Sequence, residues 1–241
     1  MLVEIKNLAR TYMMGETEVH ALRGVSLNVN RGEFVAIIGP SGSGKSTLMH
    51  LLGCLDRPTS GRYWLDGTAV EGLQDQELSR LRNRKVGFVF QTFNLIPQLN
   101  LLENVEVPLI YMGMDRVQRQ ELSLQMLQAV RLGHRSTHRP NELSGGENQR
   151  AAIARALVTN PDIILADEPT GNLDTKTGTE IMEILDELNK KGTTIVLVTH
   201  ELSKVKWARR VIYMQDGQIR RELFGDQTHQ LVELFQELPQ A

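Results

Sequence analysis

A glycine-rich segment is the clearest candidate for chemistry in this sequence. Residues 39–46 read Gly-Pro-Ser-Gly-Ser-Gly-Lys-Ser and fit the pattern G-x-x-x-x-G-K-[ST]. Its glycines allow backbone N–H groups to converge on phosphate oxygens, and a helix predicted to begin near Lys45 adds partial positive charge. We therefore predict a phosphate-binding loop in which Lys45 reaches the terminal phosphates and the Ser46 hydroxyl binds Mg²⁺. A turn that merely joins a strand to a helix is disfavoured, because the lysine and the serine are both in register.

Two carboxylates form the second candidate. Asp167-Glu168 follows the apolar residues 163–166 directly, which places both at the carboxyl end of a buried strand, where α/β sheets bind ligands. Because neighbours in a strand point in opposite directions, Asp167 can hold Mg²⁺ while Glu168 orients or deprotonates the attacking water. The alternative is an acidic pair in a solvated turn, which the preceding apolar run disfavours.

Single polar residues also follow two other apolar runs. Gln91 comes after residues 86–90 and could give its amide oxygen to Mg²⁺ or to water, although a glutamine at a strand end is often only solvated. His200 comes after residues 194–199 and could donate to the γ-phosphate, although a lone histidine usually has no catalytic role.

The apolar pattern predicts how these residues are positioned. Residues 2–30 alternate in short runs typical of an antiparallel sheet, whereas continuous apolar runs separated by helical periodicity indicate a mostly parallel α/β sheet. Asp216-Gly217 is predicted to form a hairpin turn. Helical periodicity with no strand signal predicts an inserted helical subdomain at about 94–161 and a C-terminal helical tail at 224–241. The buried strands are expected at 34–38, 86–90, 163–166 and 194–198, and the subdomain helices at 117–130 and 146–158.

Composition restricts the class of protein. The chain has 241 residues, 41% of them hydrophobic, and a formal charge of −2 from 27 basic and 29 acidic residues. This balance gives no general attraction for nucleic acid. One cysteine, Cys54, fits a reducing compartment. No apolar run approaches the ~20 residues that span a bilayer, and we expect a soluble, cytoplasmic chain.

A third motif indicates the family. Leu143-Ser144-Gly145-Gly146-Glu147, followed by Asn148-Gln149-Arg150, resembles the LSGGQ signature of ABC ATPases. Glycines at a helix start again expose N–H donors, so the sequence contains two anion-binding loops. The resemblance runs from about residue 2 to 222 and is greatest to the lipoprotein-release and macrolide-export type. Glu147 departs from the usual glutamine; we expect a modest effect, with its charge turned toward Arg150 or solvent.

The resemblance implies a fold and roles for individual residues. It implies a P-loop NTPase (RecA-like) core with an N-terminal antiparallel β subdomain, an ATP-binding domain at 1–223, and ATP with Mg²⁺ as cofactors. Tyr12 would stack on adenine, although an ordinary strand aromatic is the alternative. Gln91, Glu168 and His200 would be catalytic, and Ser46, Gln91 and Asp167 would bind the metal. The residues expected to bind nucleotide are Tyr12, Gly39, Ser41, Gly42, Ser43, Gly44, Lys45, Ser46, Thr47, Ser144, Gly145, Gly146, Glu147 and Asp174.

The same resemblance implies partners. A second copy of the chain would pack head to tail over two ATP molecules, with residues 172–174 crossing the seam. Separate transmembrane permease subunits would dock near residues 93–114, and a periplasmic adaptor is a further partner. We therefore expect an ATP-hydrolysing transporter motor at the cytoplasmic face of the inner membrane. A non-transport ABC ATPase that regulates a cell-envelope complex is the alternative.

Overall fold

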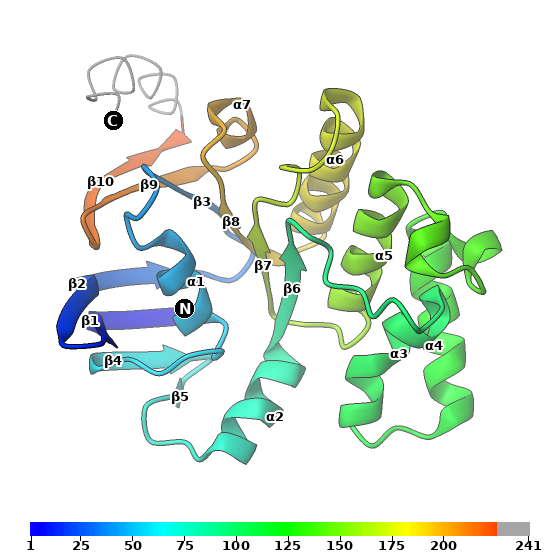
Figure 1. Cartoon of the computed structure of the whole chain (residues 1–241), viewed down its shortest axis with the longest axis horizontal. Coiled ribbons are helices and arrows are strands. Elements are labelled where there is room, and N and C mark those ends of the chain that lie inside the picture. The colour runs from blue at the N-terminus through cyan, green and yellow to red at the C-terminus, as the bar shows by residue number, and fades with distance from the viewer. Residues whose placement is uncertain (226–241) are drawn as a thin grey trace. The chain divides into compact units, whose positions relative to one another are not determined.

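The computed structural model describes residues 1–225. The chain divides into two compact units, whose helices and strands are labelled in Figure 1. The first unit contains Met1–Gly72 and the chain from Thr194 onward, and the second contains Leu73–Thr193.

The first unit begins with an antiparallel sheet in the order β2-β1-β4-β5. Val25, Leu27 and Val29 are buried while the residues between them are exposed, as their alternation predicts. The predicted antiparallel sheet is therefore confirmed, and the structure extends it with two strands beyond residue 30. Its strands are β1 (Val3–Met14), β2 (Thr17–Val29), β4 (Ser60–Leu65) and β5 (Thr68–Ala69).

The other strands of the first unit run in the order β10-β9-β3-β8. β3 pairs in parallel with both β8 and β9, and β10 returns antiparallel to β9. Asp216 and Gly217 both have positive φ, 50° and 74°, so the predicted hairpin turn is confirmed. The elements are β3 (Phe34–Ile38), α1 (Lys45–Leu52), β8 (Thr194–Val198), α7 (Leu202–Val205), β9 (Arg210–Gln215) and β10 (Gln218–Phe224).

The second unit contains the parallel pair β6 and β7 and a group of helices. α3, α4 and α5 pack on one another (Figure 1). α5 also packs so closely on β6 that a Cβ on Gly87 would lie 2.5 Å from the Ala156 carbonyl oxygen. The elements are α2 (Asp75–Lys85), β6 (Val86–Phe90), α3 (Leu101–Tyr111), α4 (Arg116–Ala129), 3-10 turns at Gly133–Arg135 and Pro140–Glu142, α5 (Gly145–Leu157), β7 (Ile163–Asp167) and α6 (Thr175–Lys190).

The predicted elements of this unit agree closely with these bounds. The two subdomain helices begin and end one residue earlier than expected, and β7 extends one residue further, to Asp167. α3 and α2 were not predicted as separate helices. In α2 only Leu78 is buried, so the helix has almost no apolar stripe to detect.

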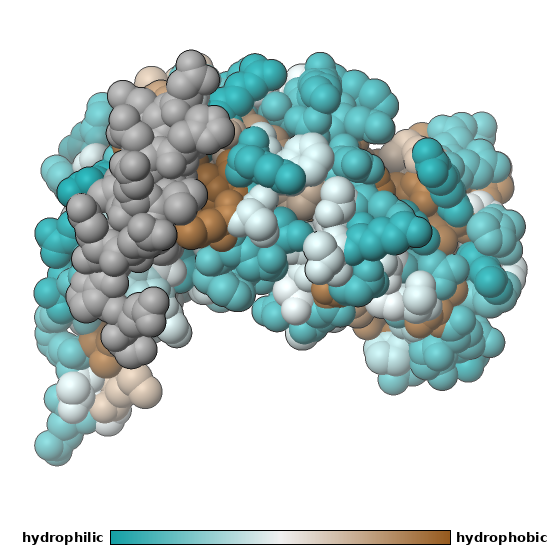
Figure 2. Space-filling view, turned by 90° about the horizontal axis from the view of Figure 1, so that it is seen from above, coloured by the Kyte–Doolittle hydropathy of each residue, from teal (hydrophilic) through white to brown (hydrophobic). Residues whose placement is uncertain are grey.

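The predicted C-terminal tail falls mostly outside the described residues. Phe224 is the last residue of β10, and residues 226–241 are not described. The domain boundaries at 1–223 and 224–241 remain predictions. None of the helices within residues 1–225 is long and apolar enough to cross a bilayer. Hydrophilic residues predominate on the face seen in Figure 2.

Candidate active site

The phosphate-binding loop of the first unit lies between β3 and α1. The Lys45 ammonium folds back over this loop and donates to the carbonyl oxygens of Gly39 at 2.9 Å and Pro40 at 2.8 Å. The Ser43 side chain is buried beneath it, whereas Ser41 and Ser46 are exposed. Lys45 is thus held at the loop by acceptors that a phosphate oxygen can replace.

Two glycines of this loop are required by close backbone contacts. A Cβ on Gly39 would lie 2.1 Å from the carbonyl oxygen of Met214, and one on Gly44 would lie 2.5 Å from that of Ala21. Gly44 also has a φ of 96°, in the left-handed region that side chains other than glycine rarely adopt. The loop therefore packs backbone against backbone, and its amide groups are fixed in position.

Tyr12 is held at its hydroxyl and on one face of its ring. The hydroxyl donates to Asp56 at 2.7 Å, and the Arg10 guanidinium lies 4.5 Å from the ring centroid. Arg10 also pairs with Asp56 at 2.8 Å. The half-buried ring therefore has a fixed orientation. A fixed ring of this kind could stack on adenine, but it is equally consistent with an ordinary aromatic residue of a strand. Adenine stacking by Tyr12 remains a prediction.

His200 follows the strand beside β3. The Thr199 N–H donates to the Ile37 carbonyl oxygen at 3.1 Å, so β3 and β8 end together. The phosphate-binding loop and His200 therefore leave the same edge of the sheet in the first unit. His200 itself is exposed.

The second unit brings Gln91, Asp167 and Glu168 to one edge. β6 and β7 are parallel with Phe90 opposite Asp167, so Gln91 and Glu168 are the next residues of the two strands. Glu168 has a φ of 45°, a conformation that is strained for residues other than glycine. Its direction is consequently set by this turn and not by the strand alternation from which we predicted it.

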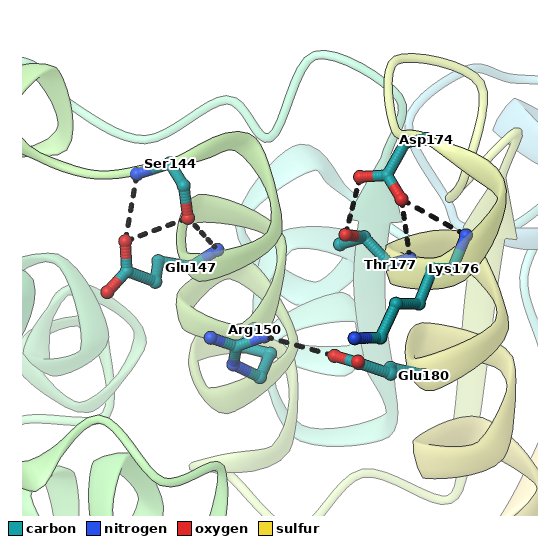
Figure 3. Close-up of polar contacts among 7 residues, drawn as sticks. All are labelled: Ser144, Glu147, Arg150, Asp174, Lys176, Thr177 and Glu180. Carbon is teal, nitrogen blue, oxygen red and sulfur yellow. Dashed lines mark hydrogen bonds and ion pairs between the residues drawn. The ribbon is translucent and has the colours of Figure 1, made fainter.

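The signature segment forms the start of α5. The Ser144 hydroxyl accepts from the Glu147 N–H at 3.3 Å, and the Glu147 carboxylate accepts from the Ser144 N–H at 2.9 Å and its hydroxyl at 2.8 Å (Figure 3). This is a capping box, in which each residue satisfies a donor of the other. The N–H groups of Gly145 and Gly146 belong to the first helical turn, which has no intrahelical acceptors for them.

The capping box determines where the extra charge of Glu147 lies. The carboxylate hydrogen-bonds with Ser144 and stays half-buried, and the charges of Arg135 and Arg150 are both close enough to stabilise its ionised form. Its nearest cation is Arg135 at 3.7 Å, while Arg150 lies 4.0 Å from Glu180. The hydrogen bond from the Ser144 N–H is the main cause that lowers the pKa of Glu147, so this carboxylate is ionised at neutral pH.

Asp174 caps the next helix. Its carboxylate accepts from the Thr177 hydroxyl at 2.6 Å and from two N–H groups at the start of α6 (Figure 3). These hydrogen bonds, led by that from the Thr177 hydroxyl, lower the pKa of Asp174. A Cβ on Gly146 would lie 2.4 Å from the Thr177 Cγ2. The starts of α5 and α6 therefore pack closely.

Sequence reasoning gave no role to Gln149 and none to Asp56. Gln149 is fully buried and donates to the carbonyl oxygens of Pro169 at 2.7 Å and Phe90 at 3.3 Å. The sequence did contain a signal that Gln149 is buried. Gln149 lies three, four and seven residues before Ala152, Ile153 and Ala156, so it shares the apolar face of the helix with them. No comparable pattern marks Asp56.

Within each unit the predicted residues come together. In the first unit, residues 39–47 and His200 follow the ends of β3 and β8; in the second, Gln91, Asp167 and Glu168 lie at the ends of β6 and β7. A Cβ on Gly145 would lie 3.1 Å from the Leu173 side chain, so the start of α5 also lies beside the loop that leads to Asp174.

Comparison with known proteins agrees with this arrangement. A family model described as "ABC transporter" matches residues 22–171. An uncharacterized ABC transporter ATP-binding protein of Thermotoga maritima is 52% identical over 93% of this chain and 98% of its own length. The macrolide export ATP-binding/permease protein MacB of Chlorobaculum tepidum is 50% identical over 100% of this chain, which spans 36% of that protein.

Solved structures extend the similarity to the fold. A dimeric, post-hydrolysis ATP-binding cassette, MJ0796 of Methanocaldococcus jannaschii, bound to ADP and Pi, has a TM-score of 0.86 and 49% identity. The match covers 92% of this chain and 98% of that one. The predicted α/β fold with a P-loop NTPase core is thus confirmed, and the chain is an ATP-binding and ATP-hydrolysing subunit that belongs to the ABC transporter family.

Proposed function

We propose that this ATPase drives export by closing, as a pair of identical chains arranged head to tail, over two ATP molecules. The observation that carries this proposal is the presence of two anion-binding helix starts in one chain, at α1 and at α5. One nucleotide does not need both from the same copy. In a two-fold arrangement the α5 start of each copy completes the site of the other.

Mg²⁺ fits the oxygen donors of the chain. Asp167 offers a carboxylate, Gln91 an amide oxygen and Ser46 a hydroxyl, which are the hard donors that Mg²⁺ prefers. The pairing of Phe90 with Asp167 brings Gln91 and Asp167 to the same edge of the second unit. The bound ion would neutralise charge on the β- and γ-phosphates during hydrolysis.

Each remaining site residue has a defined task in this proposal. Lys45 exchanges its carbonyl acceptors for phosphate oxygens, and Thr47 adds a hydroxyl to the same group. Glu168 holds the attacking water and accepts its proton, while His200 donates to the γ-phosphate. Tyr12 stacks on adenine with its other face against Arg10.

The energy needed for closure is available from few contacts. Moving an open-closed equilibrium from 1:99 to 99:1 requires about 5.5 kcal/mol, or about half of that from each of the two sites. One or two charge-assisted hydrogen bonds, at about 1.5–3 kcal/mol each, suffice. The Gly145 and Gly146 N–H groups and the Ser144 hydroxyl are the proposed donors, and the hydroxyl must first leave Glu147.

The proposed partner in the membrane is a permease, which docks on the second unit. Apolar side chains are exposed at the C-terminal end of α3, where Ile110 is 51% and Tyr111 79% exposed. Ile96 is also exposed, whereas Leu101, which lies within the expected docking segment 93–114, is fully buried core. We place the chain peripherally at the cytoplasmic face of the inner membrane, and a periplasmic adaptor on the far side is compatible with a macrolide-export type.

The test of closure uses a variant that retains ATP. Glu168→Gln keeps the shape of the side chain and removes the proposed base, so it should form a dimer with ATP and remain a monomer without it. Light scattering coupled to size-exclusion chromatography measures the mass. Adding Ser144→Arg should abolish the dimer while ATP binding persists. Rapid ATP turnover by Glu168→Gln would refute the role of the base.

A further inference from the structure

The buried amide of Gln149 lies at the junction of three segments. Its Nε2 has two N–H groups, and these reach the carbonyl oxygens of Pro169 at 2.7 Å and Phe90 at 3.3 Å. Phe90 immediately precedes Gln91, and Pro169 immediately follows Glu168. One side chain of α5 thus holds the backbone beside both proposed catalytic residues of the second unit.

Burial of this amide is costly, which argues against a role in packing alone. Gln149 is 0% exposed, and its Oε1 has no hydrogen-bond partner within residues 1–225. An unsatisfied buried carbonyl destabilises the folded state, whereas an apolar side chain of similar length would fill the same space without that penalty. The amide of Gln149 donates two hydrogen bonds, which an apolar side chain could not make.

Glu168 needs such support. Its φ of 45° costs energy that the surroundings must supply. The Gly171 N–H donates to the Glu168 carbonyl oxygen at 3.0 Å, and Gln149 holds the next carbonyl, that of Pro169. Two consecutive carbonyl groups are therefore fixed, and with them the backbone from which the Glu168 side chain projects.

The loop that carries Gln91 is tied into the same network. Gln91 donates to the Asn172 side chain at 3.3 Å, and the Asn172 side chain donates back to the Gln91 carbonyl oxygen at 3.1 Å. Arg155, also on α5, donates to the carbonyl oxygens of Phe93 and Asn94. α5 thus holds the start of this loop at Phe90 through Gln149 and at Phe93 and Asn94 through Arg155.

From these contacts we propose that Gln149 is a positioning residue, which couples the anion-binding start of α5 to the two catalytic loops of the same chain. The proposal rests on the proposed roles of Gln91 and Glu168. Ser144 is the N-cap of α5, and Gln149 lies in the second turn of this helix. A nucleotide bound by the start of α5 in one copy is thereby linked to Gln91 and Glu168, which act on the other nucleotide of the closed pair.

The test replaces the amide with an apolar side chain of similar length, Gln149→Met. The matched control is Asn189→Leu, which removes another buried amide of this unit, one that donates to the Thr193 carbonyl oxygen at 2.9 Å, at the far end of α6. Each variant should lower the melting temperature by a similar amount. Only Gln149→Met should lower kcat, by roughly 10- to 100-fold, because small displacements of catalytic groups have effects of that size.

Two further readouts separate positioning from folding. The Kd of a fluorescent ATP analogue should change by less than about threefold, because the first unit binds the phosphates. Hydrogen exchange should accelerate at residues 91–94 and 168–173 in Gln149→Met and not in Asn189→Leu. A normal kcat in Gln149→Met, or the same loss of kcat in both variants, would overturn the proposal.

Hydrogen exchange measured without nucleotide also distinguishes the positioning role of Gln149 from the proposed closure of the dimer. If Gln149→Met leaves protection of both loops unchanged, Gln149 does not position them, whatever the oligomeric state. If the loops loosen and kcat falls but Glu168→Gln forms no dimer with ATP, positioning stands and head-to-tail closure fails.

Discussion

Replacing Gly146 with alanine should force the starts of α5 and α6 apart. The new Cβ would lie 2.4 Å from the Thr177 Cγ2, about 1 Å closer than an ordinary contact. Thr177 cannot turn away without cost, because its hydroxyl donates to Asp174 at 2.6 Å. One of the two helix starts must therefore move, or the cap of α6 must break.

The magnitude follows from two opposing effects. Overpacking costs about 1–3 kcal/mol, whereas alanine in place of glycine within a helix gains up to about 1 kcal/mol. The net loss should be about 1–2 kcal/mol, which lowers the melting temperature by roughly 2–8 °C for a chain of this size. Thermal unfolding followed by circular dichroism measures it.

A second substitution tests the cause. Thr177→Ser removes the Cγ2 and keeps the hydroxyl that binds Asp174, so Gly146→Ala should be neutral or slightly stabilising in that background. Gly145→Ala is the matched control, because the one tight contact of its Cβ is with the flexible end of Leu173, at 3.1 Å, and its next neighbours are at ordinary distances of 3.7 Å and 3.9 Å. An equal loss of stability with and without Thr177→Ser would refute the steric explanation.

Two other substitutions test contacts of the proposed site. The lowered pKa of Glu147 means that its contribution to stability is present above about 4.3, the value in the unfolded chain, and is lost as pH falls through the lower folded-state pKa. Glu147→Gln should therefore flatten the dependence of unfolding free energy on pH below about 4.3, as measured in urea; an unchanged slope would show that this carboxylate is not held by Ser144. Tyr12→Ala should weaken ATP binding by about 2- to 10-fold through loss of aromatic stacking, measured with a fluorescent analogue. Tyr12→Phe should keep ATP affinity and lose only the hydrogen bond to Asp56, and equal losses in both variants would contradict stacking.

The sequence was informative where one physical requirement dominates. A strand buried on both faces must be apolar throughout, so β3, β6, β7 and β8 were visible as continuous runs. Phosphate binding requires glycines, a lysine and a hydroxyl at fixed spacing, which located residues 39–46. In contrast, α2 has a single buried residue and left no periodic signal.

The orientation of individual side chains was harder to predict from the sequence. Glu168 was placed by strand alternation, but β7 ends at Asp167 and a left-handed turn follows. The expectation for Glu147 named Arg150 or solvent and did not include the capping box, in which the serine at the N-cap and the glutamate three residues later satisfy each other. The link from Gln149 to two distant carbonyl groups depends on tertiary packing, which local periodicity does not specify.

The most direct test of head-to-tail closure mixes two inactive variants. Lys45→Ala disables the phosphate-binding loop, and Ser144→Arg disables the start of α5. In the proposed pair, a mixed dimer retains one intact site, formed by Lys45 of one copy and Ser144 of the other. An equal mixture should recover roughly a quarter of the wild-type ATPase rate if the sites act independently, because half of the dimers are mixed. No recovery in a mixture that still forms dimers would contradict the account, because both motifs would then serve the same nucleotide within one chain.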